Sequence, residues 1–103
     1  MNGFGFVIAT KMLVEGKRKV RFMYREQPVD PDDSGWRFFC GDEDQSYADD
    51  PENLGIYDIT TILDSDDSVA PYLDSPCGTA LERENDKDPF TPAKDFTFDE
   101  EGE

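Results

Sequence analysis

The side chains that most often carry out chemistry in proteins are unevenly represented in this sequence. It contains 25 Asp and Glu residues, two cysteines and no histidine. Without histidine there is no Ser–His or Cys–His pair, no imidazole metal ligand and no ordinary general base near neutral pH. Cys40 is followed by Asp42, Glu43 and Asp44, whose negative charge opposes formation of a thiolate. We therefore expect no catalytic residue and a protein that is not an enzyme.

Carboxylates are the remaining candidates for chemistry, as ligands of a divalent cation. Two Asp-rich segments, beginning at Asp42 and Asp64, resemble calcium-binding loops. Each lacks the glycine at the sixth position and the glutamate at the twelfth that such a loop requires. A phosphate-binding Gly-rich loop is also missing. We expect no metal and no cofactor, and a metal-dependent enzyme using clustered Asp and Glu is kept as a second alternative.

The charges are segregated along the chain, whose net charge is −15. Residues 1–25 carry six basic and one acidic side chain, a balance of +5, whereas residues 26–103 carry four basic and 24 acidic ones, a balance of −20. This pattern indicates either a polarised field that steers a charged partner or a basic strand that pairs with acidic neighbours within the fold. Direct nucleic-acid binding is disfavoured because phosphate contacts need a basic face.

Size and composition indicate one small folded unit. The 103 residues are 36% hydrophobic and 13% aromatic, which favours a compact fold over a disordered chain. No segment approaches the ~20 apolar residues that cross a bilayer, and residues 1–8 lack the features of a signal peptide. Two cysteines are too few for a disulfide framework. We expect a soluble cytoplasmic protein with free thiols, a single domain over residues 1–84, and an acidic, partly flexible tail over 85–103.

The first 25 residues predict two strands. Residues 3–10 are rich in Phe, Val and Ile, and residues 19–25 alternate, with Val20, Phe22 and Tyr24 on one face and Met23 on the other. The intervening segment contains a Gly-bearing turn at residues 14–17. We therefore expect these strands to form an antiparallel hairpin.

Later segments predict short elements in alternation. Residues 36–40 form an aromatic strand, and Asp42 caps a helix over 43–50 that Pro51 ends. An extended piece then reaches Tyr57, and Asp58 begins a helix to about residue 63, followed by a helical turn over 68–73 and a strand over 79–83. The expected fold class is α+β, an antiparallel sheet of about four or five strands with short helices on one side.

Acidic residues bracket the aromatic strand at 36–40 on both sides. They form either a solvated loop-and-cap region around core aromatics, or a rim of carboxylates around aromatic anchors that grips a basic protein surface. The candidate partner-binding residues are Asp32, Asp33, Trp36, Asp42, Glu43, Asp44, Asp49 and Asp50.

Several short motifs carry a family resemblance. They are MYRE at 23–26, DSGWRFF at 33–39, GDED at 41–44, NLGIY at 53–57 and LDSPCGTA at 73–80. From about residue 8 to residue 83, the chain resembles immunity protein thirty-three of bacterial polymorphic toxin systems. The resemblance implies stoichiometric neutralisation of a cognate toxin and brings no catalytic residues. The expected partner is a toxin with a basic surface, such as a nuclease; the alternative is a regulatory or scaffold protein that binds another host protein.

Overall fold

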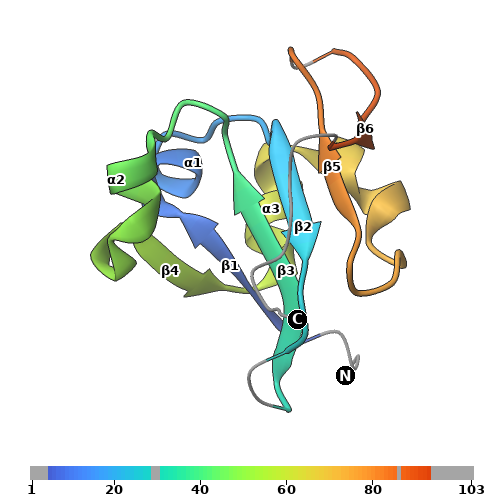
Figure 1. Cartoon of the computed structure of the whole chain (residues 1–103), viewed down its shortest axis with the longest axis horizontal. Coiled ribbons are helices and arrows are strands. Elements are labelled where there is room, and N and C mark those ends of the chain that lie inside the picture. Colours follow the sequence, from blue (N-terminus) through green and yellow to red (C-terminus); the bar gives the residue numbers. More distant parts are fainter. Residues whose placement is uncertain (1–4, 29–30, 86, 94–103) are drawn as a thin grey trace.

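A mixed β-sheet organises the residues that the computed structural model describes, 5–28, 31–85 and 87–93 (Figure 1). Within these residues the sheet has six strands in the order β4-β1-β3-β2-β5-β6. The strands are β1 (Phe6–Thr10), β2 (Phe22–Arg25), β3 (Asp33–Phe39), β4 (Leu54–Tyr57), β5 (Ala80–Glu82) and β6 (Thr91–Pro92). The helices are α1 (Lys11–Glu15), α2 (Gln45–Asp49), α3 (Ile59–Ser65) and the 3-10 turns η1 (Pro51–Asn53) and η2 (Asp67–Tyr72). The α+β fold class is confirmed, although the strand number exceeds the expected four or five.

The predicted hairpin between the first two strands is wrong. β3 lies between β1 and β2, parallel to β1 and antiparallel to β2, so the sheet is mixed and not antiparallel throughout. The chain enters α1 directly after β1, because the Thr10 side chain accepts a hydrogen bond from the Leu13 N–H at 3.3 Å and caps the helix. Leu13 is then buried in the core. This helical connection replaces the tight turn that a hairpin needs.

Within β2, Met23 lies on one face and Phe22 and Tyr24 on the other, as the alternation predicts. Met23 is fully buried in the core, whereas Phe22 and Tyr24 lie on the opposite face, within 5.6 and 5.8 Å of the Phe39 ring centre. Val20 is also buried but precedes the strand, so the alternation does not continue through it. Both faces of β2 are apolar, and the pattern alone does not identify the inner one.

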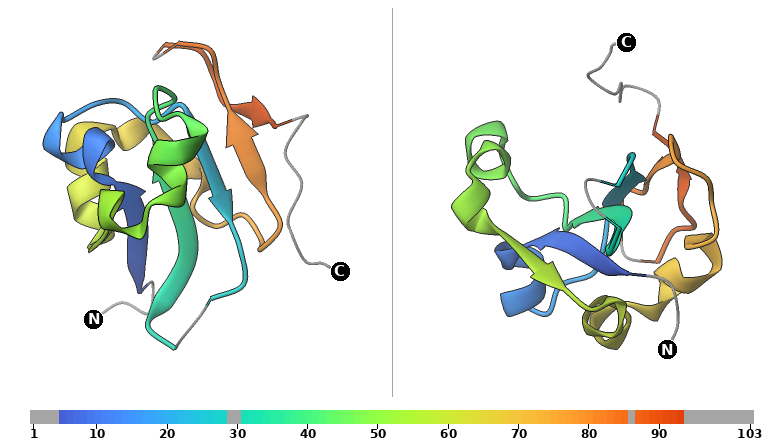
Figure 2. Two further views of the ribbon diagram at one scale, coloured as in Figure 1. Left: turned by 60° about the vertical axis from the view of Figure 1, so that its left-hand side comes forward. Right: turned by 90° about the horizontal axis from the view of Figure 1, so that it is seen from below.

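The short helices expected after β3 are present with shifted bounds. Asp44, not Asp42, caps α2, since its carboxylate accepts the Tyr47 N–H at 2.8 Å. Asp58 caps α3 as expected, and η2 covers most of the turn predicted over residues 68–73. Figure 2 shows α1 and α3 on the same side of the sheet, where they contact each other.

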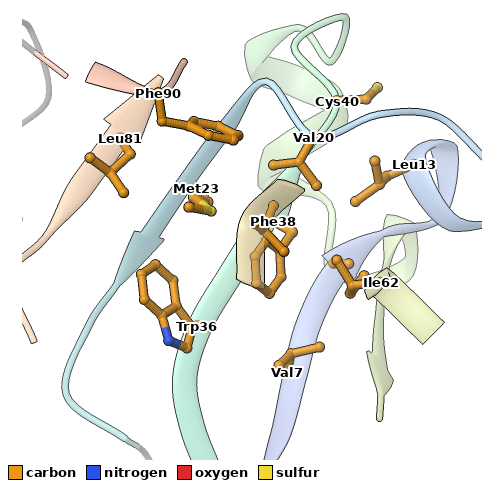
Figure 3. Close-up of a cluster of buried hydrophobic side chains, with 12 residues drawn as sticks. Val7, Leu13, Val20, Met23, Trp36, Phe38, Cys40, Ile62, Leu81 and Phe90 are labelled. Carbon is orange, nitrogen blue, oxygen red and sulfur yellow. The ribbon is translucent and has the colours of Figure 1, made fainter. Parts of the chain in front are cut away.

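The core lies between this helical side and the sheet (Figure 3). Trp36 and Phe38 of β3 occupy its centre, with ring centres 5.9 Å apart, and both are fully buried. The indole N–H of Trp36 donates to the carbonyl of Leu73 at 3.1 Å, which satisfies the polar atom of the ring inside the core. The aromatic strand predicted at 36–40 is therefore the central packing element.

The sheet continues beyond the expected domain boundary at residue 84. β6 pairs with β5 through Leu81–Pro92 and Glu82–Thr91, and Phe90 between them is buried. Residues 94–103 of the expected tail lie outside the described residues. No helix in the described part is long and apolar enough to cross a membrane.

Candidate partner-binding surface

The motif at 33–39 is built around a buried ion pair. Two N–H groups of Arg37 donate to the two carboxylate oxygens of Asp33 at 2.9 and 2.8 Å, and its Nε donates to Glu26 at 2.5 Å. The Asp33 side chain is fully buried and that of Arg37 is 5% exposed. Burial alone would lower the pKa of Arg37, but its hydrogen bonds to Asp33 and Glu26 outweigh burial and raise it. Asp33 therefore holds the fold together and offers no free carboxylate to a partner.

Gly35 introduces an irregularity into the motif at residues 33–39. Its φ of +90° lies in the region that favours glycine, and an added Cβ would lie 2.3 Å from the carbonyl oxygen of Glu26. The register between β1 and β3 shifts here, from Phe6 opposite Asp33 to Ile8 opposite Arg37. Such an irregularity re-aims the residues that follow it. The most distinctive motif of the sequence thus specifies sheet geometry.

Trp36 and Asp33 must therefore be removed from the predicted partner-binding residues. Trp36 has no exposed surface and Asp33 is 5% exposed, so neither reaches a partner in this structure. The interpretation of the aromatic strand as core, and not as anchors within an acidic rim, is the one that the packing favours.

Glu43 is half-buried and organises the turn after β3. Its carboxylate accepts the Thr10 hydroxyl at 2.5 Å and the backbone N–H groups of Cys40 at 2.8 Å and Gly41 at 2.9 Å. Burial alone would raise the pKa of Glu43, but these hydrogen bonds outweigh it and lower that pKa. Because Thr10 also caps α1, Glu43 ties the acidic turn to the helix.

The other candidate carboxylates are exposed, and four of them flank α2. Asp42 pairs with Arg18, Asp44 caps α2, Asp49 is the last residue of α2, and Asp50 follows it and caps η1. Asp32 lies at the end of β3 that is opposite to α2. At the usual rise of an extended strand, the length of β3 separates Asp32 from the carboxylates around α2 by about 25 Å. The structure therefore gathers Asp42, Asp44, Asp49 and Asp50 around α2, which we call the α2 acidic surface, and separates Asp32 from it.

The basic segment of the sequence borders the same turn. Lys17, Arg18, Lys19 and Arg21 line an open hollow of about 340 Å³ with Cys40 at its wall. Arg18 pairs with Asp42, and Lys19 donates to the carbonyl of Ser65 at 2.9 Å. The basic side chains thus gather on one patch, and one of them, Arg18, pairs with an acidic neighbour. Steering of a charged partner stays a prediction.

Neither cysteine nor carboxylate chemistry gains support from the geometry. Burial, and then the charge of Glu43, raises the pKa of the Cys40 thiol to about 11, so it stays protonated near neutral pH. In the second Asp-rich segment, Asp66 is buried against Arg83 at 2.5 Å and caps η2. Among the residues described, no three His, Cys, Asp or Glu side chains are grouped to hold a metal ion.

Sequence reasoning missed one exposed feature, the strand β4. Ile56 is 67% exposed, the single large hydrophobic side chain so exposed in the described ranges. Glu52, Asp58 and Glu15 surround this strand, and burial together with the charge of Glu15 raises the pKa of Tyr57. The extended conformation of residues 54–57 is readable from the sequence, but their position at the sheet edge is not, because it depends on non-local pairing.

Comparison with known proteins gives one family. The model of a family described as the Immunity protein Imm33 domain matches residues 7–94. Comparisons with curated proteins and with solved structures find no match. The matched range covers the described sheet from Val7 in β1 to the end of β6.

Proposed function

Since the chain belongs to the Imm33 family of immunity proteins, we propose that it neutralises a cognate bacterial toxin by binding it one-to-one in the cytoplasm of the producing cell. The family match carries this proposal. The proposed contact is the α2 acidic surface, and the proposed partner surface is basic. The protein acts by binding and not by catalysis.

The arrangement of charge supports an electrostatic contact. Three of the four carboxylates of the α2 acidic surface, Asp44, Asp49 and Asp50, lie on a short helix and its two caps, and Asp42 lies in the turn before it, where it pairs with Arg18. Charges placed in this way accelerate association with an oppositely charged protein, and salt weakens their effect. The lifetime of the complex then depends on the few contacts that lose water.

Co-expression tests the proposal. The chain should restore growth to cells that produce the toxin encoded beside its gene. The variant in which Asp42, Asp44, Asp49 and Asp50 are all changed to Asn should lose this protection and associate with the toxin at least about tenfold more slowly. Asn is as good a helix cap as Asp, so α2 and η1 should remain folded.

A matched control separates the local surface from total charge. Four exposed acids outside the α2 acidic surface, Asp67, Asp74, Glu84 and Asp88, are changed to their amides, which alters net charge equally. This variant should protect cells and associate within about twofold of the wild type. Failure of the wild type to protect cells contradicts the immunity role. Equal loss in both variants contradicts the proposed contact surface alone.

A further inference from the structure

The two edges of the sheet are protected differently. β6 contains two residues, one of them Pro92, and proline has no N–H to offer an incoming strand. β4 has four residues, with neither proline nor lysine, and no strand of the described chain pairs with its outer side. Short edges, proline and lysine are the usual means by which proteins prevent unwanted strand pairing. β4 lacks all three.

The outer side of β4 has both polar and apolar groups available. β4 pairs with β1 in regular antiparallel register from Val7–Tyr57 to Thr10–Leu54. In such a pair every second residue directs its N–H and C=O away from the partner strand. Ile56 lies opposite Ile8 and is 67% exposed. An added strand would bond to these backbone groups and cover Ile56.

The charges around β4 indicate what kind of strand fits. Glu52 lies two residues before the strand, Asp58 immediately follows it, and both are exposed. Glu15 is close enough to Tyr57 to act on it electrostatically. Lys11, one residue beyond the Thr10–Leu54 pair, is the nearby basic residue. The surroundings are therefore acidic on balance and favour a basic occupant.

A second copy of this chain fits this edge less well. Antiparallel pairing of two β4 strands across a two-fold axis would place Glu52 of one copy beside Asp58 of the other. Glu52 lies in η1 and Asp58 caps α3, so these like charges would meet just beyond the strand ends, where they repel each other. The charge pattern thus favours a different, basic protein over self-association.

From these observations we infer that the outer edge of β4 receives an extended basic segment of the toxin, which adds a seventh strand to the described sheet beside Ile56. This inference rests on the proposed function and adds the mode of binding to it. Backbone hydrogen bonds would supply affinity, while Glu52 and Asp58 would select basic side chains.

Hydrogen exchange on the complex is the direct test. The full chain is mixed with the purified toxin encoded beside its gene, and amide exchange is compared with that of the free chain. We expect slower exchange in residues 54–57 on binding. We also expect Ile56→Lys to weaken toxin affinity at least about tenfold, because it places a charge where the added strand would pack.

Thr91→Lys is the matched control, since it adds the same charge to the opposite, short edge and should change affinity less than about twofold. If the toxin binds but residues 54–57 exchange as in the free chain, the β4 inference fails and the proposed function stands. If the toxin does not bind at all, both fail. If protection of 54–57 occurs without toxin and rises with chain concentration, the occupant is a second copy and the inference is overturned.

Discussion

Replacing Asp33 by Asn should unfold the protein at a much lower temperature, because the carboxylate is fully buried and holds two N–H groups of Arg37. Asn keeps one acceptor oxygen for the Gly35 N–H, which donates to Asp33 at 2.8 Å. It removes the charge, however, and points an NH₂ group at the guanidinium. The change therefore tests the ion pair while preserving side-chain shape.

The expected loss follows from the burial of the pair. Removing one partner of a buried ion pair costs about 3–5 kcal/mol. Arg37 retains Glu26, whose side chain is 38% exposed, so the lower end of this range, about 3 kcal/mol, applies. In a domain of about 100 residues this corresponds to a fall in Tm of about 12–24 °C.

Thermal and urea unfolding followed by circular dichroism and Trp36 fluorescence measure the effect. Asp74→Asn, at an exposed site, is the control and should change stability by less than about 0.5 kcal/mol. In a double-mutant cycle with Arg37→Met, the two losses should overlap by about 1–3 kcal/mol. A loss below about 1 kcal/mol for Asp33→Asn, or strictly additive losses, would refute the structural role assigned to this pair.

Three further results are expected from other sites. Gly35→Ala should cost about 3 kcal/mol and Gly78→Ala about 1 kcal/mol in unfolding free energy, because both have positive φ but only the first has backbone within 4 Å of an added Cβ; equal losses in urea unfolding would count against this. At pH 8, thiol titration should label exposed Cys77 quickly and buried Cys40 only after denaturation; two equally fast thiols would contradict it. The folded pKa of Glu43 lies below its ordinary value of 4.5, so its stabilising contribution is present above that value and lost as pH falls through the folded pKa. As the pH falls, the free energy of unfolding should therefore decline less steeply in Glu43→Gln than in the wild type. Parallel curves for the two proteins would contradict the role assigned to Glu43.

Local signals predicted the elements whose structure depends on neighbouring residues. Asp58 before Ile59, Ile62 and Leu63 predicted the start of α3, since both the cap and the apolar spacing lie within a few residues. The helical turn predicted over residues 68–73 overlaps η2, which is also a local element. These interactions form within one short stretch of chain, so the local sequence is sufficient to predict them.

Non-local pairing explains what the sequence did not reveal. A Gly-bearing turn favours a hairpin locally, but insertion of β3 between β1 and β2 depends on Leu13 reaching the core and on the bend at Gly35. The alternation separates Met23 from Phe22 and Tyr24 but does not say which face of the strand is buried. The buried face is decided by what packs against it, which composition does not specify.

Only part of the candidate partner-binding surface can be predicted from the sequence, and for the same reason. Exposure of the carboxylates around α2 follows from their positions in caps and turns. Burial of Asp33 does not, although its spacing of four from Arg37 places both on one face of a strand and was an available signal. The position of β4 at the sheet edge depends on strand order, which no local pattern in the sequence specifies.

One-to-one sequestration of a toxin by this protein is tested most directly by calorimetric titration of the purified chain into the purified toxin encoded beside its gene. We predict saturable one-to-one binding with a Kd at or below about 100 nM in low salt, weakening as salt rises. Absence of binding at about 10 μM of each protein, or heat that does not saturate at one-to-one, would contradict the proposal that this acidic member of the Imm33 family acts by sequestering its toxin.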